Sequence, residues 1–484
     1  MTTNQSNKTI EMSESPLLGR GLGEASILQA QRAYFHSGAT LDINFRLAML
    51  KKLQKALCKW EKALTDALWA DLHKSYQEAY LTELSIVKAE ITGHLRHLRS
   101  WAKPKRRPTP IKMFPSRSRI VSEPLGNTLI MAPWNYPVQL LLNPLVGAIS
   151  AGCTAVLKPS PYVPTVSAVL EKMITDTFDP QYVAIVQGNR DVNQALLAQR
   201  YDLIFFTGSP SLGKLVMEAA SKHLTPVILE LGGKSPCIVD RHADIKTAAK
   251  RIAWGKTLNS GQTCIAPDYL LIHEEVKEQF IEAFAKAVKQ LHGGDIAKSK
   301  HYVRMVNDRA FERVKGYLAE GDIRYGGRAH AEERFIEPTL LDTRISLADP
   351  KADELANAKG VLTEEIFGPV FPMLTFQHLD EVQGYITRRE KPLAFYYFGR
   401  ETDGLDLIRR TSSGGACIND TIMHIANEHI PFGGVGNSGM GGYHGEESFR
   451  VFSHRRSVVL TGTWIDLPFR YMPYRMFGLV KKIV

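Results

Sequence analysis

The sequence predicts an α/β protein built from two α/β bodies that follow one another along the chain. From Gly126 onward, short β-rich runs alternate with helical stretches, and a second series of this kind begins near Pro236. Apolar strands separated by helices are typical of a parallel sheet covered on both faces, so the first series predicts a doubly wound sheet. The 484 residues, 44% of them hydrophobic, are enough to bury more than one core.

The chain begins with a polar leader and a long helix. Residues 1–24 lack the apolar core of a secretory signal, and we expect them to be flexible. Between Phe45 and Leu72, apolar residues recur at three- and four-residue spacing, which indicates an amphipathic helix that packs against the rest of the molecule. We assign Cys58 to the apolar side of this helix.

An extended arm is expected next. Residues 103–121 contain four prolines and many positive charges, which prevents a helix, so we predict that residues 104–121 leave the first body as an extended segment.

The alternation that follows defines the elements of both bodies. In the first body the expected strands lie at 127–133, 154–159, 182–186, 203–208 and 226–231, and the expected helices at 144–151, 165–177, 193–199 and 211–222. In the second body the expected strands lie at 235–239, 269–273 and 371–376, and the expected helices at 275–291 and 308–320. The coarse pattern is strand and helix in turn, with no internal repeat.

The last fifty residues differ from the bodies. Residues 433–445 carry seven glycines, a density that indicates irregular backbone or close approach. The tail, 461–484, mixes aromatic and basic residues, among them Arg470, Arg475, Lys481 and Lys482. We expect it to cover a partner subunit or to make a weak contact with a membrane surface.

Composition limits the class of protein. The formal charge of +10 comes from 60 basic and 50 acidic residues that are dispersed, which favours a solvated surface or a subunit contact over nucleic-acid binding. No apolar run is long enough to span a membrane. The five cysteines are scattered and show no metal-ligand spacing, so we predict a cytoplasmic protein, with at most peripheral membrane contact, that holds no metal.

Three residues are candidates for covalent chemistry. Cys264 follows Gly261 among small polar residues, where a thiol is accessible as a nucleophile, although a lone cysteine is more often structural. Glu230 ends an apolar strand before a glycine turn, where burial would raise its pKa and make it a general base, or where it caps a turn or pairs with Lys234. Asn135 lies between two prolines and offers an uncharged N–H donor for an oxyanion, or serves as a turn residue.

A second group of residues is suited to a nucleotide. Gly208, Ser209 and Gly213 lie where an apolar strand turns into a helix, so backbone N–H groups and the helix N-terminus would face a pyrophosphate. An ordinary strand-to-helix turn would look the same. Lys158 ends another strand of the series, and a cation there suits an adenosine ribose or its phosphate.

Seven motifs, taken together and in order, resemble the aldehyde dehydrogenase superfamily from about residue 25 to residue 459. They are P-W-N at 133–135, K-P-S at 158–160, F-T-G-S at 206–209, E-L-G-G-K at 230–234, G-Q-T-C at 261–264, E-E-I-F-G-P at 364–369 and P-F-G-G at 431–434. The run C-I-A-P-D-Y that begins at Cys264 and the stretch from Asn419 to Gly445 resemble the class 3 branch, which acts on fatty and aromatic aldehydes.

The resemblance implies a role for each matching residue. Cys264 would attack the aldehyde, the Asn135 amide and the Cys264 backbone N–H would hold the oxyanion, and Glu230 would activate the water that hydrolyses the thioester. The residues implied as contacts of NAD or NADP are Trp134, Lys158, Ser160, Gly208, Ser209, Gly213, Leu231, Glu365 and Phe367. The implied products are carboxylates, formed from medium or long aliphatic or from aromatic aldehydes.

The resemblance also implies a domain plan. A Rossmann-type cofactor domain would comprise residues 25–103 and 122–233, and an α/β catalytic domain residues 234–435. The segments 104–121 and 436–460 would form a small β arm that pairs across the subunits of a homodimer.

One departure from the family pattern concerns the cofactor. Many NAD-preferring relatives carry a glutamate three residues after the lysine of K-P-S, and this chain has Pro161 there. Without that carboxylate nothing repels a 2′-phosphate, and Lys158 would attract one. We therefore predict that NADP is tolerated or preferred.

Three other functions agree less well with these residues. An acylating dehydrogenase that passes the thioester to coenzyme A has no use for a strong base such as Glu230. A Cys–His hydrolase would explain neither the nucleotide-like turns nor Glu365. A catalytically silent structural protein that keeps the fold has no use for Cys264, Glu230 and Asn135 together.

Overall fold

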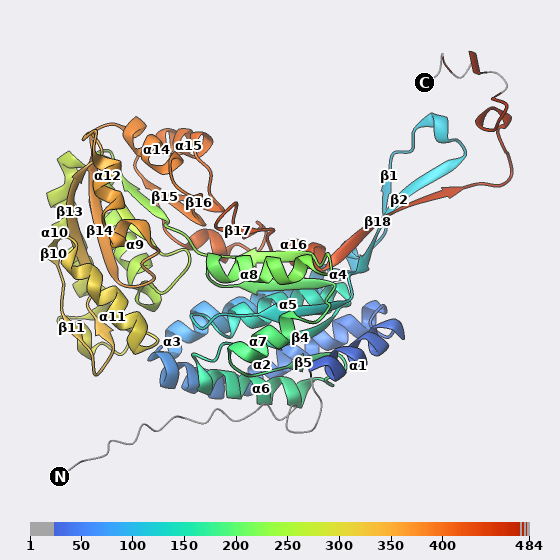
Figure 1. The fold of residues 1–484 in the computed structure, drawn as a ribbon, viewed down its shortest axis with the longest axis horizontal. Helices are drawn as coiled ribbons and strands as arrows, with labels where there is room; N and C mark the ends of the chain where they lie inside the picture. Colours follow the sequence, from blue (N-terminus) through green and yellow to red (C-terminus); the bar gives the residue numbers. More distant parts are fainter. Residues whose placement is uncertain (1–23, 475–476, 479–480, 482–484) are drawn as a thin grey trace, which may run out of the picture.

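The computed structural model describes residues 24–474, 477–478 and 481 (Figure 1). The leader expected over residues 1–24 lies outside this range except for its last residue, and so do Arg475 and Lys482 of the tail. Two sheets of mainly parallel strands form the two bodies, and a three-stranded antiparallel sheet projects from them. Among the described helices, none combines the length and apolar character that a membrane crossing requires.

A six-stranded sheet forms the centre of the first body. Its strands, in spatial order, are β17 (Gly439–Met440), β7 (Val227–Glu230), β6 (Leu203–Thr207), β3 (Asn127–Met131), β4 (Thr154–Lys158) and β5 (Val183–Ile185). All neighbours are parallel except β17, which is antiparallel to β7. Strands β3, β4, β5 and β6 are buried along their whole length, which explains their continuous apolar sequences.

Helices cover this sheet. They are α1 (Glu24–His36), α2 (Ile43–Leu72), α3 (Tyr76–Ala79), α4 (Ser85–Trp101), α5 (Gln139–Ala151), α6 (Pro164–Thr177), α7 (Arg190–Leu197) and α8 (Pro210–Ser221). The predicted amphipathic helix is confirmed as α2: the Asp42 side chain caps its N-terminus, and Leu50, Leu53 and Leu57 are fully buried. The assignment of Cys58 to its apolar side was wrong because Cys58 is one residue past that stripe and is exposed.

The second body contains a seven-stranded sheet. Its strands, in spatial order, are β10 (Asp322–Tyr325), β13 (Thr339–Ser346), β14 (Val370–Phe376), β9 (Tyr269–His273), β8 (Pro236–Val239), β15 (Ala394–Phe398) and β16 (Gly415–Ile418). Only the edge strand β10 is antiparallel to its neighbour. The longer helices of this body are α9 (Ile245–Thr257), α10 (Lys277–His292), α11 (Asp308–Gly316), α14 (Leu379–Thr387) and α15 (Glu401–Arg410), with α12 (Ala352–Asn357) and α13 (Gly360–Thr363) as short ones.

The projecting sheet joins two segments that are far apart in the sequence (Figure 1). Strand β2 (Ser116–Pro124) lies between β1 (Lys105–Arg107) and β18 (Ser453–Thr461), which follows α16 (Glu446–Val451). The antiparallel register of β2 and β18 runs from the pair Pro124 and Ser453 to the pair Ser116 and Thr461. The predicted extended arm is confirmed. The two segments pair with each other within one chain, and the expectation that this sheet also joins two subunits stays a prediction.

Candidate active site

The predicted cofactor and catalytic motifs meet at one edge of the six-stranded sheet. In the register of its strands, Met131 pairs with Lys158 and with Phe206, and Thr207 pairs with Glu230. The loops that follow these strands therefore leave the sheet side by side at the carboxyl ends of the parallel strands, where open α/β sheets bind ligands. The P-W-N, K-P-S, F-T-G-S and E-L-G-G-K motifs all lie there.

The glycine turn after β6 leads directly into α8. Ser209 is the N-cap of this helix, and its Oγ accepts a hydrogen bond of 3.4 Å from Leu212 N–H. Gly213 is buried against Leu231, because a Cβ at Gly213 would lie 2.8 Å from the Leu231 Cδ2 atom. The helix thus packs tightly on the strand β7 side, and its N-terminus, with the exposed Ser209, offers N–H groups to an anion.

Lys158 is a buried cation at the end of β4. Its Nζ donates to the Pro159 carbonyl at 2.8 Å, and desolvation lowers the pKa of the ammonium to about 8. Ser160, also buried, accepts a hydrogen bond of 3.3 Å from Tyr162 N–H, and Pro161 continues the turn. A buried cation gains stability from an anionic ligand, which suits the predicted role of Lys158.

Glu365 reaches across from the second body to the E-L-G-G-K turn. A Cβ at Gly232 would overlap the Glu365 carboxylate, so only glycine permits this approach. The backbone N–H of Gly233 also donates to this carboxylate, while burial and the nearby Asp268 raise the pKa of Glu365 to about 8. The E-L-G-G-K and E-E-I-F-G-P motifs, which are far apart in the sequence, are therefore in contact here.

Two aromatic rings, one from the P-W-N motif and one from the E-E-I-F-G-P motif, lie against each other. Trp134 and Phe367 lie edge to face, with ring centroids 5.4 Å apart. Phe367 has a φ of +47°, a left-handed conformation that a bulky residue rarely adopts. The ring is held in place by the surrounding structure, as is common at ligand sites.

Cys264 follows a turn with an unusual backbone. Asn259, Ser260 and Gly261 have φ values of +50°, +53° and +70°, and all three residues are buried. A Cβ at Gly261 would overlap the Gly368 carbonyl oxygen, so the loop passes against the E-E-I-F-G-P motif. Strained backbone of this kind persists only where the surroundings over-determine it, and it clusters at functional sites.

The surroundings of Cys264 favour the neutral thiol. Desolvation, together with the Glu365 and Glu230 carboxyl groups, raises its pKa to about 12. The backbone N–H groups of Cys264 and Ile265 act in the opposite direction by donating to the sulfur. The same N–H groups are available to an oxygen atom bound at the carbon that the sulfur attacks.

Glu230 is a buried acid without a hydrogen-bond partner among the described residues. The residue is 3% exposed, and neither carboxyl oxygen is hydrogen-bonded. Desolvation raises its pKa well above the ordinary glutamate value. The alternative in which Glu230 pairs with Lys234 was wrong, because the Lys234 ammonium binds Asp268 and the Glu364 carbonyl. An unsatisfied buried carboxyl group costs stability, which indicates a functional reason for its presence.

Asn135 approaches the Cys264 loop. Its Nδ2 donates to the Gln262 carbonyl at 3.1 Å, which uses one of the two N–H donors of the amide. Gln262 is itself fixed, because its side chain donates to the Asn259 and Arg304 carbonyls and accepts from Val306 N–H. The structure therefore brings together Asn135, Cys264, Glu230 and Glu365, all four of which had been singled out from the sequence.

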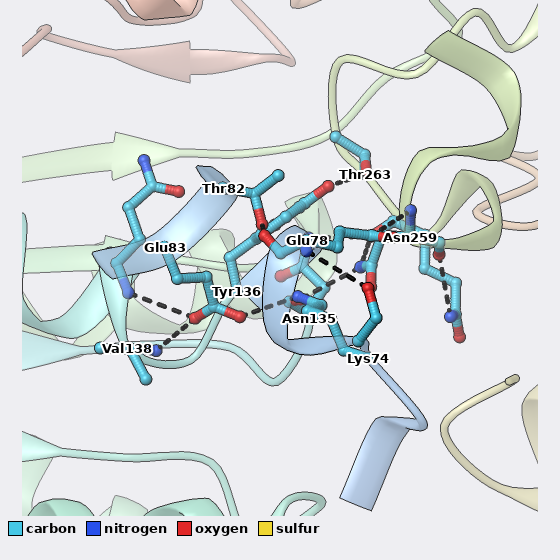
Figure 2. A network of polar contacts seen from close by, with 12 residues as sticks. Lys74, Glu78, Thr82, Glu83, Asn135, Tyr136, Val138, Asn259 and Thr263 are labelled. Atoms are coloured by element: carbon cyan, nitrogen blue, oxygen red, sulfur yellow. Dashed lines mark hydrogen bonds and ion pairs between the residues drawn. The ribbon is translucent and has the colours of Figure 1, made fainter. Parts of the chain in front are cut away.

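A buried polar network behind this site was missed by the sequence analysis. It includes Lys74, Glu78, Glu83 and Tyr136, which contact the segments that carry Asn135 and Cys264 (Figure 2). Charged residues at such positions read as surface residues in a single sequence, because lysine and glutamate are rarely buried. The Tyr136 position, directly after the P-W-N motif, was the one available signal.

Comparison with known proteins agrees with this geometry. Residues 23–458 match the model of the aldehyde dehydrogenase family. A 4,4'-diaponeurosporen-aldehyde dehydrogenase of Staphylococcus aureus is 44% identical over 92% of this chain and 95% of its own length. A dimeric NADP-preferring aldehyde dehydrogenase of the dog, Canis lupus familiaris, is 41% identical over 93% of this chain and 97% of its own length.

A solved structure extends the comparison to the fold. The substrate-bound state of Staphylococcus aureus AldH superimposes with a TM-score of 0.90 at 43% identity, covering 95% of this chain and 98% of the other. The predicted aldehyde dehydrogenase-like α/β fold is thereby confirmed, and so is the resemblance to the class 3 branch, since a family 3 member B1 of Homo sapiens is 43% identical over 90% of both chains. The chain belongs to the aldehyde dehydrogenase family.

Proposed function

We propose that this protein oxidises medium or long aliphatic or aromatic aldehydes to carboxylates with NAD or NADP, through a thioester on Cys264 that Glu230-activated water hydrolyses. One observation carries the proposal: a buried carboxyl group without a partner lies close enough to the Cys264 thiol to raise its pKa. A nucleophile and a base held in one water-poor site are the two groups that acyl-enzyme chemistry requires.

The residues at the sheet edge fit a dinucleotide. The α8 N-terminus with Gly208 and Ser209 suits the pyrophosphate, buried Lys158 with Ser160 suits the adenosine ribose, and Trp134, Leu231, Glu365 and Phe367 line the nicotinamide side. The cradle depends on Gly213 and Gly232, where a Cβ would collide with neighbouring side chains. When bound, the cofactor supplies the two-electron acceptor for the oxidation.

The acylation step uses Cys264 and Asn135. The Cys264 thiol, which is partly exposed, releases its proton to solvent as the sulfur adds to the aldehyde carbon, and the carbonyl oxygen becomes an oxyanion. The Asn135 amide and the Cys264 backbone N–H donate hydrogen bonds to that oxygen, which stabilises the charge where it develops. A bound cofactor would supply the acceptor for the hydride that this adduct must lose, and the acyl group would then remain on the Cys264 sulfur as a thioester.

The deacylation step uses Glu230. Its carboxylate takes a proton from water, the hydroxide adds to the thioester carbon, and the carbon–sulfur bond breaks to release the carboxylate product and Cys264. A carboxyl group with a raised pKa is matched to this task near neutral pH. A direct base for water also favours hydrolysis over transfer of the acyl group to coenzyme A.

The substrate class rests on the relatives. A relative named for a 4,4'-diaponeurosporen-aldehyde, which is 44% identical, supports long apolar aldehydes for this chain as well. The test is steady-state kinetics on a series of aliphatic and aromatic aldehydes with each cofactor, followed by intact-mass detection of the acyl adduct. Turnover with an adduct on Cys264 supports the proposal, and no reduced cofactor with any aldehyde would favour a silent protein.

A cofactor prediction follows from Pro161. Replacing Pro161 by glutamate places a carboxylate beside the 2′-position that Lys158 attracts, so we expect kcat/KM with NADP to fall roughly 10- to 100-fold and that with NAD to change less. The dimeric NADP-preferring relative supports this direction. Pro161→Gln is the control, since it adds a similar side chain without charge. Equal losses with both cofactors would contradict the prediction.

We propose a homodimer held by the segments 104–121 and 436–460, with the cofactor domain at 25–103 and 122–233 and the catalytic domain at 234–435. The dimeric relative supports the assembly, and the arm sheet projects away from both bodies. Strand β18 is an edge strand of that sheet, and edge strands offer unpaired backbone groups to another chain. Sedimentation at micromolar concentration would reveal a monomer if this assembly is wrong.

We also propose that the cytoplasmic protein touches anionic membrane surfaces through its tail. Trp464, Met472 and Phe477 are 72%, 79% and 65% exposed, and Arg470 and Lys481 lie among them. We expect the protein to sediment with vesicles containing anionic lipid but not with neutral ones, and to be released by high salt. A Trp464→Ser, Arg470→Glu protein that sediments as well as the native chain would exclude the tail as the contact.

A further inference from the structure

A buried ion pair lies beside the segment that carries Asn135 (Figure 2). The Lys74 ammonium and the Glu83 carboxylate are 2.8 Å apart, and both side chains are fully buried. The Lys74 ammonium also lies 4.2 Å from the centre of the Tyr136 ring. Lys74 follows the C-terminus of α2, and Glu83 lies in η1 (Tyr80–Leu84), a single π-helical turn before α4.

The ion pair forms hydrogen bonds with the backbone that carries Asn135. Lys74 Nζ donates to the Asn135 carbonyl at 3.0 Å, while Glu83 accepts from Val138 N–H at 2.8 Å and Gln139 N–H at 3.4 Å. The backbone from Asn135 to Gln139, at the carboxyl end of the P-W-N motif, is therefore tied to one charged pair. These hydrogen bonds to the backbone, and not side-chain packing alone, fix the position of the Asn135 amide.

Glu78 forms a hydrogen bond with the backbone of the turn that precedes Cys264. Its carboxylate accepts from Asn259 N–H at 2.8 Å, at the first of the three left-handed residues. The Asn259 amide in turn donates to the carbonyls of Asn135 and Gln262, at 3.0 Å each. A second link joins the Tyr136 hydroxyl to Thr263 Oγ1 at 2.7 Å, one residue before the nucleophile.

Stability alone does not account for these contacts. A buried ion pair seldom stabilises a fold more than apolar residues of the same volume, because desolvation opposes the attraction. A π-helical turn and left-handed non-glycine residues also cost free energy, and they recur at functional sites. The contacts instead fix the distance between two loops that come from different bodies of the molecule.

We propose that Lys74, Glu83 and Glu78 are positioning residues for acylation, which hold the Asn135 oxyanion donor and the Cys264 sulfur at one separation. This inference rests on the proposed function. Lys74 and Glu83 set the Asn135 side of the hole, and Glu78 sets the Cys264 side through Asn259. None of the three is among the residues assigned to the cofactor or to water activation, so cofactor binding does not depend on them directly.

Glu78 offers the sharper test because the buried ion pair is left intact. Glu78→Ala removes the acceptor of Asn259 N–H, and we expect the acylation rate to fall on the order of 10- to 100-fold, as a small misplacement of reacting groups does. The rate is measured by single-turnover formation of reduced cofactor. Glu78→Gln restores most of it, because an amide oxygen also accepts a hydrogen bond. The cofactor KM stays near its native value.

A matched control separates position from stability. Asp202 accepts the backbone N–H of Asn127 at 2.8 Å, the same kind of bond at the opposite edge of the sheet. Asp202→Ala should lower the melting temperature about as much as Glu78→Ala without slowing acylation. If both variants slow acylation equally, or if neither does while the native protein turns over, the positioning role is wrong and the proposed function stands. Absence of turnover by the native protein would instead remove the proposed function itself.

A second, more conservative variant tests the same inference if Glu78→Ala fails to fold. Tyr136→Phe keeps the volume and the contact with Lys74 and removes only the link to Thr263. We expect a smaller, severalfold loss of acylation rate with unchanged cofactor KM. A native rate in Tyr136→Phe together with one in Glu78→Ala would overturn the inference.

Discussion

Replacing Cys264 by alanine is expected to lower aldehyde oxidation at least about 10⁴-fold, because loss of the nucleophile removes the covalent route altogether. The fold should persist, since the residue is only partly buried and its loop is held by Gln262 and Asn259. The measurement is initial-rate formation of reduced cofactor, with the acyl adduct followed by intact mass.

Cys417 provides the control for that experiment. It is the other partly buried cysteine, and burial likewise raises its pKa, to about 11, while its sulfur lies 3.4 Å from His424 Nδ1. Cys417→Ala should retain turnover and the adduct. If Cys264→Ala kept native activity, or if the acyl group were found on Cys417, the proposed chemistry would be assigned to the wrong sulfur.

The parallel strands of the first body and β8, β9 and β14 of the second were predicted because they are largely apolar runs, whereas β13, β15 and β16 were not predicted. Leu203–Thr207 and Tyr269–His273 are buried on both faces, so nothing interrupts the pattern. Helix ends were less predictable. The helix expected at 193–199 begins at Arg190 because Asn189 caps it, and the one expected to continue to residue 320 changes at Gly316 into a 3-10 turn.

Several of the described helices were not predicted, and α4 and α9 show two different reasons. Helix α4 places Val87, Ile91 and Leu98 on its buried face at helical spacing, so its signal was present in the sequence and was overlooked. Helix α9 buries mainly alanines between lysines, which leaves little contrast between its faces. Its position depends on packing against α10 in the folded protein.

The residues of the candidate site also fall into those that the sequence pattern identified and those that it did not. Glu230 and Lys158 were identified because each ends an apolar strand, and Asn135 and Ser209 because each follows one. The network of Lys74, Glu78 and Glu83 could not be recognised from local pattern, because the backbone groups that it binds lie 55 to 181 residues away along the chain, as in the Glu78–Asn259 bond. Only the tertiary fold shows that Lys74 and Glu83 are fully buried and that Glu78 is partly buried.

Replacing Glu230 by glutamine is expected to separate the two half-reactions. Acylation continues, so one equivalent of reduced cofactor forms per Cys264, and deacylation slows roughly 10²- to 10⁴-fold because water has lost its base. The acyl-enzyme then accumulates and is visible by intact mass after rapid quenching. In the native protein, deacylation should become faster as pH rises, because the raised pKa leaves Glu230 protonated until the pH approaches it.

The same substitution tests the environment of Glu230 independently of activity. A glutamate whose pKa is raised by folding favours the folded state while it is protonated, so this contribution is complete below the unfolded-state pKa and is lost as pH rises towards the folded-state value. Relative to Glu230→Gln, the native protein should therefore lose up to about 1.4 kcal/mol of unfolding free energy per pH unit across that window. Lys158 and other sites titrate equally in both proteins and cancel. A difference that does not change with pH would mean that Glu230 is hydrated or paired in solution, and the base assignment would then lose its physical support.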